Sequence, residues 1–195
     1  PTSVPYLDLF VLPDAGIDPV LDALNGAQHS IRMVMYLITE PQIIQAMKDA
    51  VARGVDTQLI LELNPYGGSS GNVDVGTDLL EAGVRLKWDN RAFNYTHEKA
   101  IIIDDEWMIL LTGNMTSSTF SANRDFGVID TNPDDVAEVI KVFEADWDRD
   151  TIDLSDSRLA WAPDNSRDRI LAMFDQAQSR IDLEHQSFQD EEMID

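Results

Sequence analysis

The stretch His97-Glu98-Lys99-Ala100-Ile101-Ile102-Ile103-Asp104 decides how this chain folds around its polar residues. Its apolar centre, Ala100 to Ile103, is rich in β-branched side chains, which is typical of a buried strand. Side chains two residues apart in a strand point to the same face, so His97 and Lys99 are expected to enter one pocket. The segment therefore predicts a nucleophile and a charge stabiliser side by side.

A return strand follows this segment. Asp104 and Asp105 predict a turn, and 107–112 predicts a strand that ends in Thr112-Gly113-Asn114. The resulting hairpin would bring Asn114 back toward His97. For Asp104 the position after an apolar strand favours a structural role, since Asp commonly stabilises such turns.

Apolar runs alternate with helical patterns along the first 150 residues. Strands are predicted at 7–12, 31–38, 58–63 and 84–88, and helices at 17–27, 41–53, 75–82 and 133–148. This alternation predicts an α/β fold, a mainly parallel sheet flanked by helices. The Gly- and Ser-rich stretch Pro65–Gly71 predicts a loop, either at the rim of a pocket or uninvolved in function.

The chain of 195 residues carries 14 basic and 36 acidic side chains, a net charge of −22. Binding to phosphate backbones depends on basic surface, so broad nucleic-acid binding is disfavoured. The acidic surface also fits a solubility function, such as adaptation to high salt. The absence of cysteine excludes disulfides, thiolate metal sites and cysteine nucleophiles.

No apolar stretch approaches the length of a membrane span, and no signal peptide is visible. The chain begins with Pro1 rather than Met, which suggests processing or trimming. We therefore expect an extracellular or periplasmic protein whose contact with a membrane, where there is one, is peripheral.

A repeat is found when the chain is compared with itself at an offset of 150 residues, with nine identities between about 9–44 and 159–194. The sequence predicts a first repeat at 1–157 and the truncated start of a second at 158–195. A helix around Leu171 and a strand around Ile181 would have apolar faces without a sheet of their own. A complementary C-terminal half, as a separate chain or a cleaved fragment, is the expected partner.

The pattern His-x-Lys, four residues, Asp, then six residues and a tetrad ending in Asn resembles the phospholipase D superfamily, whose members cleave or exchange phosphodiesters. In the tetrad, Leu111-Thr112-Gly113-Asn114 stands where the family has Gly-Ser-x-Asn, so that Thr112 keeps the hydroxyl beside the site. A family carboxylate about eleven residues later corresponds to Asp125. The resemblance implies two such repeats about a pseudo-twofold axis, each giving one histidine to a shared site.

The chemistry of these residues suggests their roles. His97 would attack phosphorus to give a phosphohistidine, while Lys99 and Asn114 donate hydrogen bonds to the non-bridging oxygens. Asp125 would orient His97. The leaving alcohol would take its proton from a histidine of the absent half. No metal or other cofactor is required.

The expected function is a phosphodiester hydrolase or transphosphatidylase with a phospholipid substrate favoured. A nuclease, a cardiolipin-synthase-like transferase and a non-catalytic binding module on the same fold are the alternatives. His29 is expected on the surface, and His185 stays outside the catalytic set. Tyr36 is interpreted as sheet core, and the segment 91–95 as the approach to the site.

Overall fold

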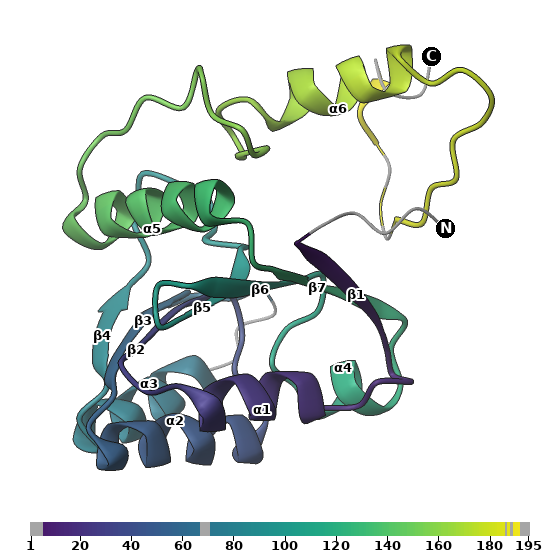
Figure 1. Ribbon diagram of the computed structural model, residues 1–195. Coiled ribbons are helices and arrows are strands. Elements are labelled where there is room, and N and C mark those ends of the chain that lie inside the picture. Colours follow the sequence, from purple (N-terminus) through teal and green to yellow (C-terminus); the bar gives the residue numbers. More distant parts are fainter. Residues whose placement is uncertain (1–5, 67–70, 186, 188, 192–195) are drawn as a thin grey trace. The chain divides into compact units, whose positions relative to one another are not determined.

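The computed structural model describes residues 6–66, 71–185, 187 and 189–191. The chain divides into two compact units, Pro1–Thr151 and Ile152–Asp195. The first unit is a layered α/β structure, in which the helices lie on both faces of one sheet (Figure 1).

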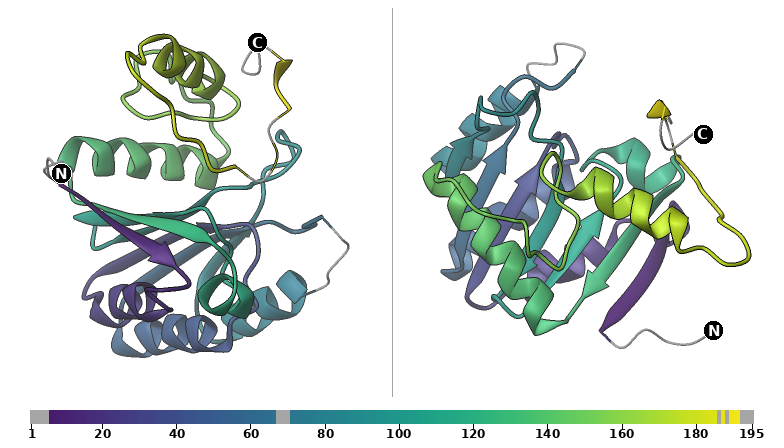
Figure 2. Two further views of the ribbon diagram at one scale, coloured as in Figure 1. Left: turned by 90° about the vertical axis from the view of Figure 1, so that its right-hand side faces the viewer. Right: turned by 90° about the horizontal axis from the view of Figure 1, so that it is seen from above.

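Across the described residues of the first unit, seven strands form a single sheet in the order β1-β7-β6-β5-β2-β3-β4. The strands are β1 (Leu7–Leu12), β2 (Ser30–Met35), β3 (Asp56–Leu61), β4 (Arg85–Trp88), β5 (Lys99–Ile103), β6 (Trp107–Leu111) and β7 (Asp125–Asp130). One face carries the helices α1 (Asp18–Gly26), α2 (Pro41–Arg53) and α3 (Gly71–Glu81), and the other carries α5 (Pro133–Asp148), as Figure 2 shows from two further sides. A short helix, α4 (Ser117–Ser121), follows β6.

The expectation of helices flanking a sheet is confirmed, but the expectation of a mainly parallel sheet is wrong. Among the described strands only β2, β3 and β4 pair in parallel, and the other four pairings are antiparallel. Helical crossovers join β2 to β3 and β3 to β4, whereas β5 and β6 form a hairpin and β1 pairs with β7 at the edge. Alternating sequence patterns do not specify which strand lies next to which.

Local sequence explains where the helices begin and end. In α2, Pro41 occupies the first turn and the Glu40 carboxylate accepts a hydrogen bond from the Gln42 amide at 3.3 Å. Gly54 ends the helix with φ of +92°, a left-handed conformation that glycine adopts at low cost. The helix then buries Ile43 and Met47 against Met33 and other sheet residues in the principal core.

The β5–β6 hairpin is fixed at its turn by the carboxylate of Asp104. Asp104 and Asp105 have φ of +54° and +60°, and the Glu106 amide donates to the Ile103 carbonyl at 3.0 Å, as in a type I′ turn. The predicted turn is therefore present.

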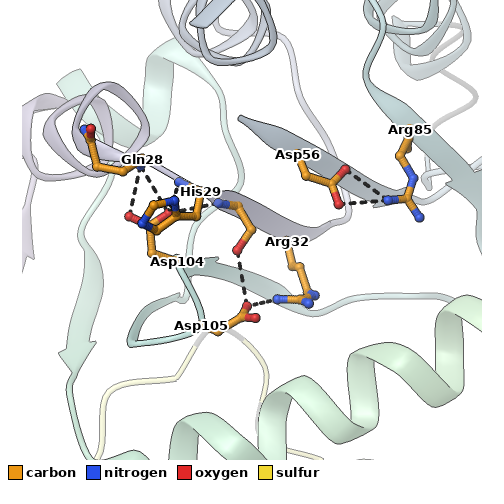
Figure 3. A network of polar contacts seen from close by, with 8 residues as sticks. Gln28, His29, Arg32, Asp56, Arg85, Asp104 and Asp105 are labelled. Atoms are coloured by element: carbon orange, nitrogen blue, oxygen red, sulfur yellow. Dashed lines mark hydrogen bonds and ion pairs between the residues drawn. The ribbon is translucent and has the colours of Figure 1, made fainter. Parts of the chain in front are cut away.

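The Asp104 carboxylate also accepts hydrogen bonds from three successive amides where the α1–β2 connection enters β2 (Figure 3), at 3.0 Å from Gln28, 2.7 Å from His29 and 2.9 Å from Ser30. These bonds hold the pKa of Asp104 below its usual value, although burial opposes them. Asp105 beside it forms an ion pair with Arg32. The turn is thereby joined to the start of β2.

Of the loop predicted at Pro65–Gly71, residues 67–70 lie outside the described residues. Within the described part of the chain, no helix combines the length and apolar character needed to cross a membrane.

In its described residues the second unit contains the helix α6 (Ser166–Asp175), which falls where the 150-residue offset places the counterpart of α1. The strand expected around Ile181 is absent from the described residues 177–185. A strand needs a neighbour to satisfy its backbone groups, and the described residues of the second unit supply none. Ile181 and Leu183 are 50% and 53% exposed.

Candidate active site

His97 and Lys99 lie at the junction of a loop and β5. Lys99 is the first residue of the strand, opposite Met35 at the end of β2, and His97 precedes the strand. The Lys99 ammonium donates a 2.6 Å hydrogen bond back to the His97 carbonyl oxygen. The Lys99 side chain is therefore held against the His97 backbone by this bond, and the two side chains share an aromatic neighbour.

The shared neighbour is Tyr36, which directly follows β2. Its ring centroid lies 4.6 Å from that of His97, and the Lys99 Nζ lies 5.1 Å from the same ring. Tyr95 approaches Tyr36 edge-on at 6.0 Å. Tyr36 thus belongs to the site as well as to the core, and its place directly after a buried strand that pairs with β5 is the sequence signal that could have indicated it.

Lys99 is a buried cation, only 5% exposed. Burial lowers its pKa from 10.5 to about 8, while the negative charges of Asp125 and Glu98 act in the opposite direction. The ammonium is the charged form near neutral pH, where it offers a partly desolvated positive charge to an anion.

The His97 side chain is exposed, and its pKa lies below the usual 6.5 because of partial burial and the nearby Lys99 charge. The imidazole is therefore neutral near pH 7, as a nucleophile must be. Within the described residues its ring nitrogens make no hydrogen bond, and its contact is the Tyr36 ring.

Asp125 begins β7 and is held by Thr112. The Thr112 hydroxyl donates to Asp125 Oδ1 at 2.7 Å and accepts from the Phe126 amide at 2.9 Å. Gly113, the third residue of the tetrad, lies close to this carboxylate. A Cβ added at Gly113 would lie 2.9 Å from the Asp125 Cγ and 2.4 Å from a Thr119 methyl carbon, which is too close for any side chain, so this position requires glycine. The structure records no hydrogen bond between the described Asp125 and His97 side chains.

Asn114 follows this glycine in a segment tied to the continuation of β2. The Met115 amide donates to the Leu37 carbonyl at 3.0 Å, and the Thr39 amide donates to the Met115 carbonyl at 2.8 Å. The Asn114 Oδ1 is enclosed without a hydrogen-bond partner in the described residues. Such a buried polar atom is costly unless a further group binds there.

Glu98 points away from this cluster, because neighbouring residues of an extended chain face opposite sides. It is partly buried, with Asp146 of α5 close enough to repel its charge. Burial and Asp146 raise the pKa of Glu98 to about 7, although Lys99 opposes the shift.

Two buried polar residues that sequence reasoning missed support the site from behind. Glu62 is 2% exposed and accepts from the Thr96 amide at 2.8 Å, just before His97. Asn72 is fully buried and donates to the carbonyls of Tyr36 at 2.8 Å and Glu62 at 2.7 Å. Among the described residues, no group of three or more His, Asp or Glu side chains is arranged to hold a metal ion.

The sequence of this chain is similar to those of known proteins. The model of the family described as "Cardiolipin synthase, PLD-like domain" matches residues 20–147. The mitochondrial cardiolipin hydrolase of Mus musculus is 25% identical over 148 residues, which cover 76% of this chain and 62% of that protein. Cardiolipin synthase A of Pseudomonas syringae pv. syringae (strain B728a) is 25% identical over 130 residues, which cover 65% of this chain and 27% of that protein. The chain thus spans less than two thirds of these relatives.

Solved structures share the fold. Nuc from Salmonella typhimurium, a phospholipase D family member, superposes with a TM-score of 0.65 at 24% identity, over 73% of this chain and 93% of that one. A polyphosphate kinase from Porphyromonas gingivalis gives a TM-score of 0.71 at 22% identity, over 87% of this chain and 30% of that one.

Proposed function

The chain belongs to the PLD-like domain family of the cardiolipin synthases, and on that premise we propose that it is a phospholipase D-like phosphodiesterase, a hydrolase or transphosphatidylase. The observation that carries the proposal is the buried Lys99 ammonium beside a neutral, exposed His97. A phosphodiester repels nucleophiles by its charge, so a nucleophile has to be coupled to a cation.

In the proposed reaction a ring nitrogen of His97 attacks phosphorus and the bond to the leaving oxygen breaks. The phosphoryl group is then carried as a phosphohistidine, and the leaving oxygen takes a proton from an acid. Water or an acceptor alcohol attacks next and frees His97. Lys99 and Asn114 neutralise the non-bridging oxygens throughout.

Asp125 is proposed to stabilise the imidazolium that forms as His97 attacks. Its Oδ1 is occupied by Thr112, and no hydrogen bond to Oδ2 exists in the described residues. The charge of Asp125 already acts on Lys99, so the carboxylate is within electrostatic reach of the cluster. Thr112 holds this carboxylate, and Asp104 holds the far end of the hairpin.

The acid for the leaving group is proposed to come from a complementary half that carries a second His-x-Lys motif, as a separate chain, a cleaved fragment or a second copy of this chain. His29 is not suited to that function, because it lies beside the Asp104 turn, at the opposite end of the hairpin from His97. His185 belongs to the second unit and stays outside the proposed catalytic set.

Phospholipid is the favoured substrate class. The mitochondrial cardiolipin hydrolase and the cardiolipin synthase A to which the chain is similar are both named for cardiolipin, a phospholipid. The net charge of −22 opposes binding to nucleic acid, whose affinity depends on many basic contacts. An extracellular or periplasmic location remains our prediction.

The decisive experiment is capture of the covalent intermediate. Rapid acid-free denaturation during turnover of cardiolipin vesicles, followed by mass spectrometry, should find a phosphoryl adduct on the peptide containing His97. A single-stranded DNA substrate serves as the comparison, and the variant His29→Ala serves as the matched control. Absence of turnover with both substrates, in the presence of the C-terminal half, would favour the non-catalytic module.

A further inference from the structure

Tyr36 occupies a position between the two reactive groups of the site. Its ring contacts the His97 ring at 4.6 Å with an interplanar angle of 60°, and the Lys99 ammonium lies 5.1 Å from the same ring. Tyr36 is 8% exposed and Lys99 5%, so the contact between the ring and the ammonium is largely shielded from water. One aromatic ring therefore borders both the proposed nucleophile and its cation.

The face of an aromatic ring is electronegative and attracts cations, and the attraction grows when water is excluded. Lys99 lies within the roughly 6 Å at which this attraction is significant. Its single hydrogen bond among the described residues is the one to the His97 carbonyl, so two of its three donors remain for an anion. The ring stabilises the ammonium without using a donor.

Tyr36 is held at three points: its backbone carbonyl, its hydroxyl and its ring. The Tyr36 carbonyl accepts from Asn72 at 2.8 Å, and Asn72 is fully buried and joins the ends of β2 and β3. The Tyr36 hydroxyl accepts from the Tyr66 amide, and Tyr95 packs against the ring edge-on. A side chain held in this way has little freedom to leave the two groups it touches.

We propose that Tyr36 is a positioning residue, whose ring keeps the Lys99 ammonium charged and the His97 imidazole aimed at one shared phosphate position. The kinetic part of this inference rests on the proposed phosphodiesterase function. The electrostatic part concerns Lys99 alone and is testable without turnover.

The test replaces Tyr36 by Phe and then by phenylalanines carrying one, two and three ring fluorines. Fluorine withdraws charge from the ring face while changing its volume little, so the series varies the attraction for a cation at nearly constant packing. The readout is the titration of the Lys99 side-chain carbon resonance by NMR, assigned among the four lysines of the chain by the variant Lys99→Arg.

We expect Tyr36→Phe to titrate close to the parent, since the ring is kept. Across the fluorinated series the pKa of Lys99 should fall by about half a unit to one unit, because the charged form loses its partner. Asp125 and Glu98 raise this pKa and are unchanged throughout, and His97 is neutral in the pH range concerned. A pKa that does not depend on fluorine content would overturn the proposal.

Turnover gives a second, separate readout. Tyr36→Leu should lower kcat about tenfold or more with a smaller change in KM, and the upper limb of the pH profile should move to lower pH. Tyr6→Leu is the matched control, since Tyr6 is 57% exposed and lies next to β1, away from the site. Where Tyr36→Leu fails to fold, the fluorinated series decides; where the parent shows no turnover, the Lys99 titration decides.

Discussion

Thr112 and Asp125 are joined by a 2.7 Å hydrogen bond that links the end of β6 to the start of β7. The same hydroxyl accepts from the Phe126 amide, so one side chain fixes both the carboxylate and its backbone. Gly113 lies directly under the carboxylate, where a Cβ would be 2.9 Å from it. Asp125 is therefore held by packing and one hydrogen bond, and its charge can be removed without moving it.

Replacing Asp125 by Asn should keep the bond to Thr112 and remove the charge. We expect kcat to fall by about two orders of magnitude with little change in KM, since an amide does not stabilise an imidazolium. The high-pH limb should also move to lower pH, because Asp125 raises the pKa of Lys99. A pH–rate profile identical to that of the parent would remove Asp125 from the site.

The variant His97→Ala should abolish turnover, by several orders of magnitude, and leave the fold intact, because the exposed imidazole carries no hydrogen bond of the described fold. Hydrolysis of a chromogenic phosphodiester in the assembled two-half protein measures this. His29→Ala is the control: the backbone amide that donates to Asp104 is kept in this variant, and the side chain lies at the opposite end of the hairpin from His97, so activity should be kept. Retained activity in His97→Ala would end the nucleophile assignment.

Lys99→Met should lower turnover but raise the folding stability at neutral pH. Loss of the ammonium is expected to lower kcat about a hundredfold to a thousandfold. The folded pKa of about 8 lies below the ordinary 10.5, so the charged lysine destabilises the parent below pH 8, and this penalty disappears between pH 8 and 10.5.

Denaturant unfolding at several pH values tests the second part. Lys99→Met should be more stable than the parent at pH 7, by on the order of 1 to 3 kcal/mol, and the difference should shrink as pH rises toward 10.5. A variant that is less stable at pH 7 would show that the lysine contributes more through its bond to His97 than it costs by burial.

Asp104→Ala should destabilise the fold by about 2 to 4 kcal/mol, because three amides lose their acceptor and alanine tolerates the positive φ poorly. Asp104→Asn keeps an acceptor and a residue that adopts this conformation, so its cost should be smaller. The pKa of Asp104 is depressed, so its contribution is complete above pH 3.8 and is lost as pH falls through the folded value. Thermal unfolding at pH 7 and at pH 3 measures both effects.

Glu98→Gln should remove a pH dependence of the folding stability whose sign is opposite to that of Asp104. The folded pKa of about 7 exceeds the ordinary 4.5, so the native chain binds more protons between these values and the parent loses stability as pH rises from 4.5 to 7. At pH 8 the variant should be more stable by on the order of 1 to 3 kcal/mol. Equal slopes of stability against pH in the two proteins would contradict the assignment.

The sequence was sufficient for features that a single segment encodes. The β5–β6 hairpin, the Asp104 turn and the bounds of α2 follow from apolar runs, turn residues and the Pro41 and Gly54 signals, and all are present in the structure. The site residues His97, Lys99, Asn114 and Asp125 could be proposed from spacing, and their chemical roles stay predictions.

Features that depend on which segments become neighbours were not predictable from the same patterns. β1 pairs with β7 from the far end of the unit, and β2 pairs antiparallel with β5; together with the β5–β6 and β6–β7 pairings, these make the sheet mostly antiparallel. The sequence pattern predicts Tyr36 only as a core residue, because its contact with the His97 ring depends on the pairing of β2 with β5. The stretch around Ile181 has strand-like composition, but no strand neighbours it among the described residues of the second unit, and 177–185 is irregular.

The hairpin places Lys99 and Asp104 at opposite ends of β5, about 17 Å apart at some 3.3 Å per residue. The His-x-Lys-x4-Asp motif thus combines two independent functions: His97 and Lys99 supply the proposed chemistry, and Asp104 stabilises the fold. Only Asp104 depends on the three amides of Gln28–Ser30. Grafting the eight residues into another hairpin would transfer the reactive groups without the backbone amides that bind Asp104 and hold the end of β5. A transplant has to carry the Gln28–Ser30 backbone as well, and a deep mutational scan of the motif should divide its positions between those that change turnover and those that change abundance.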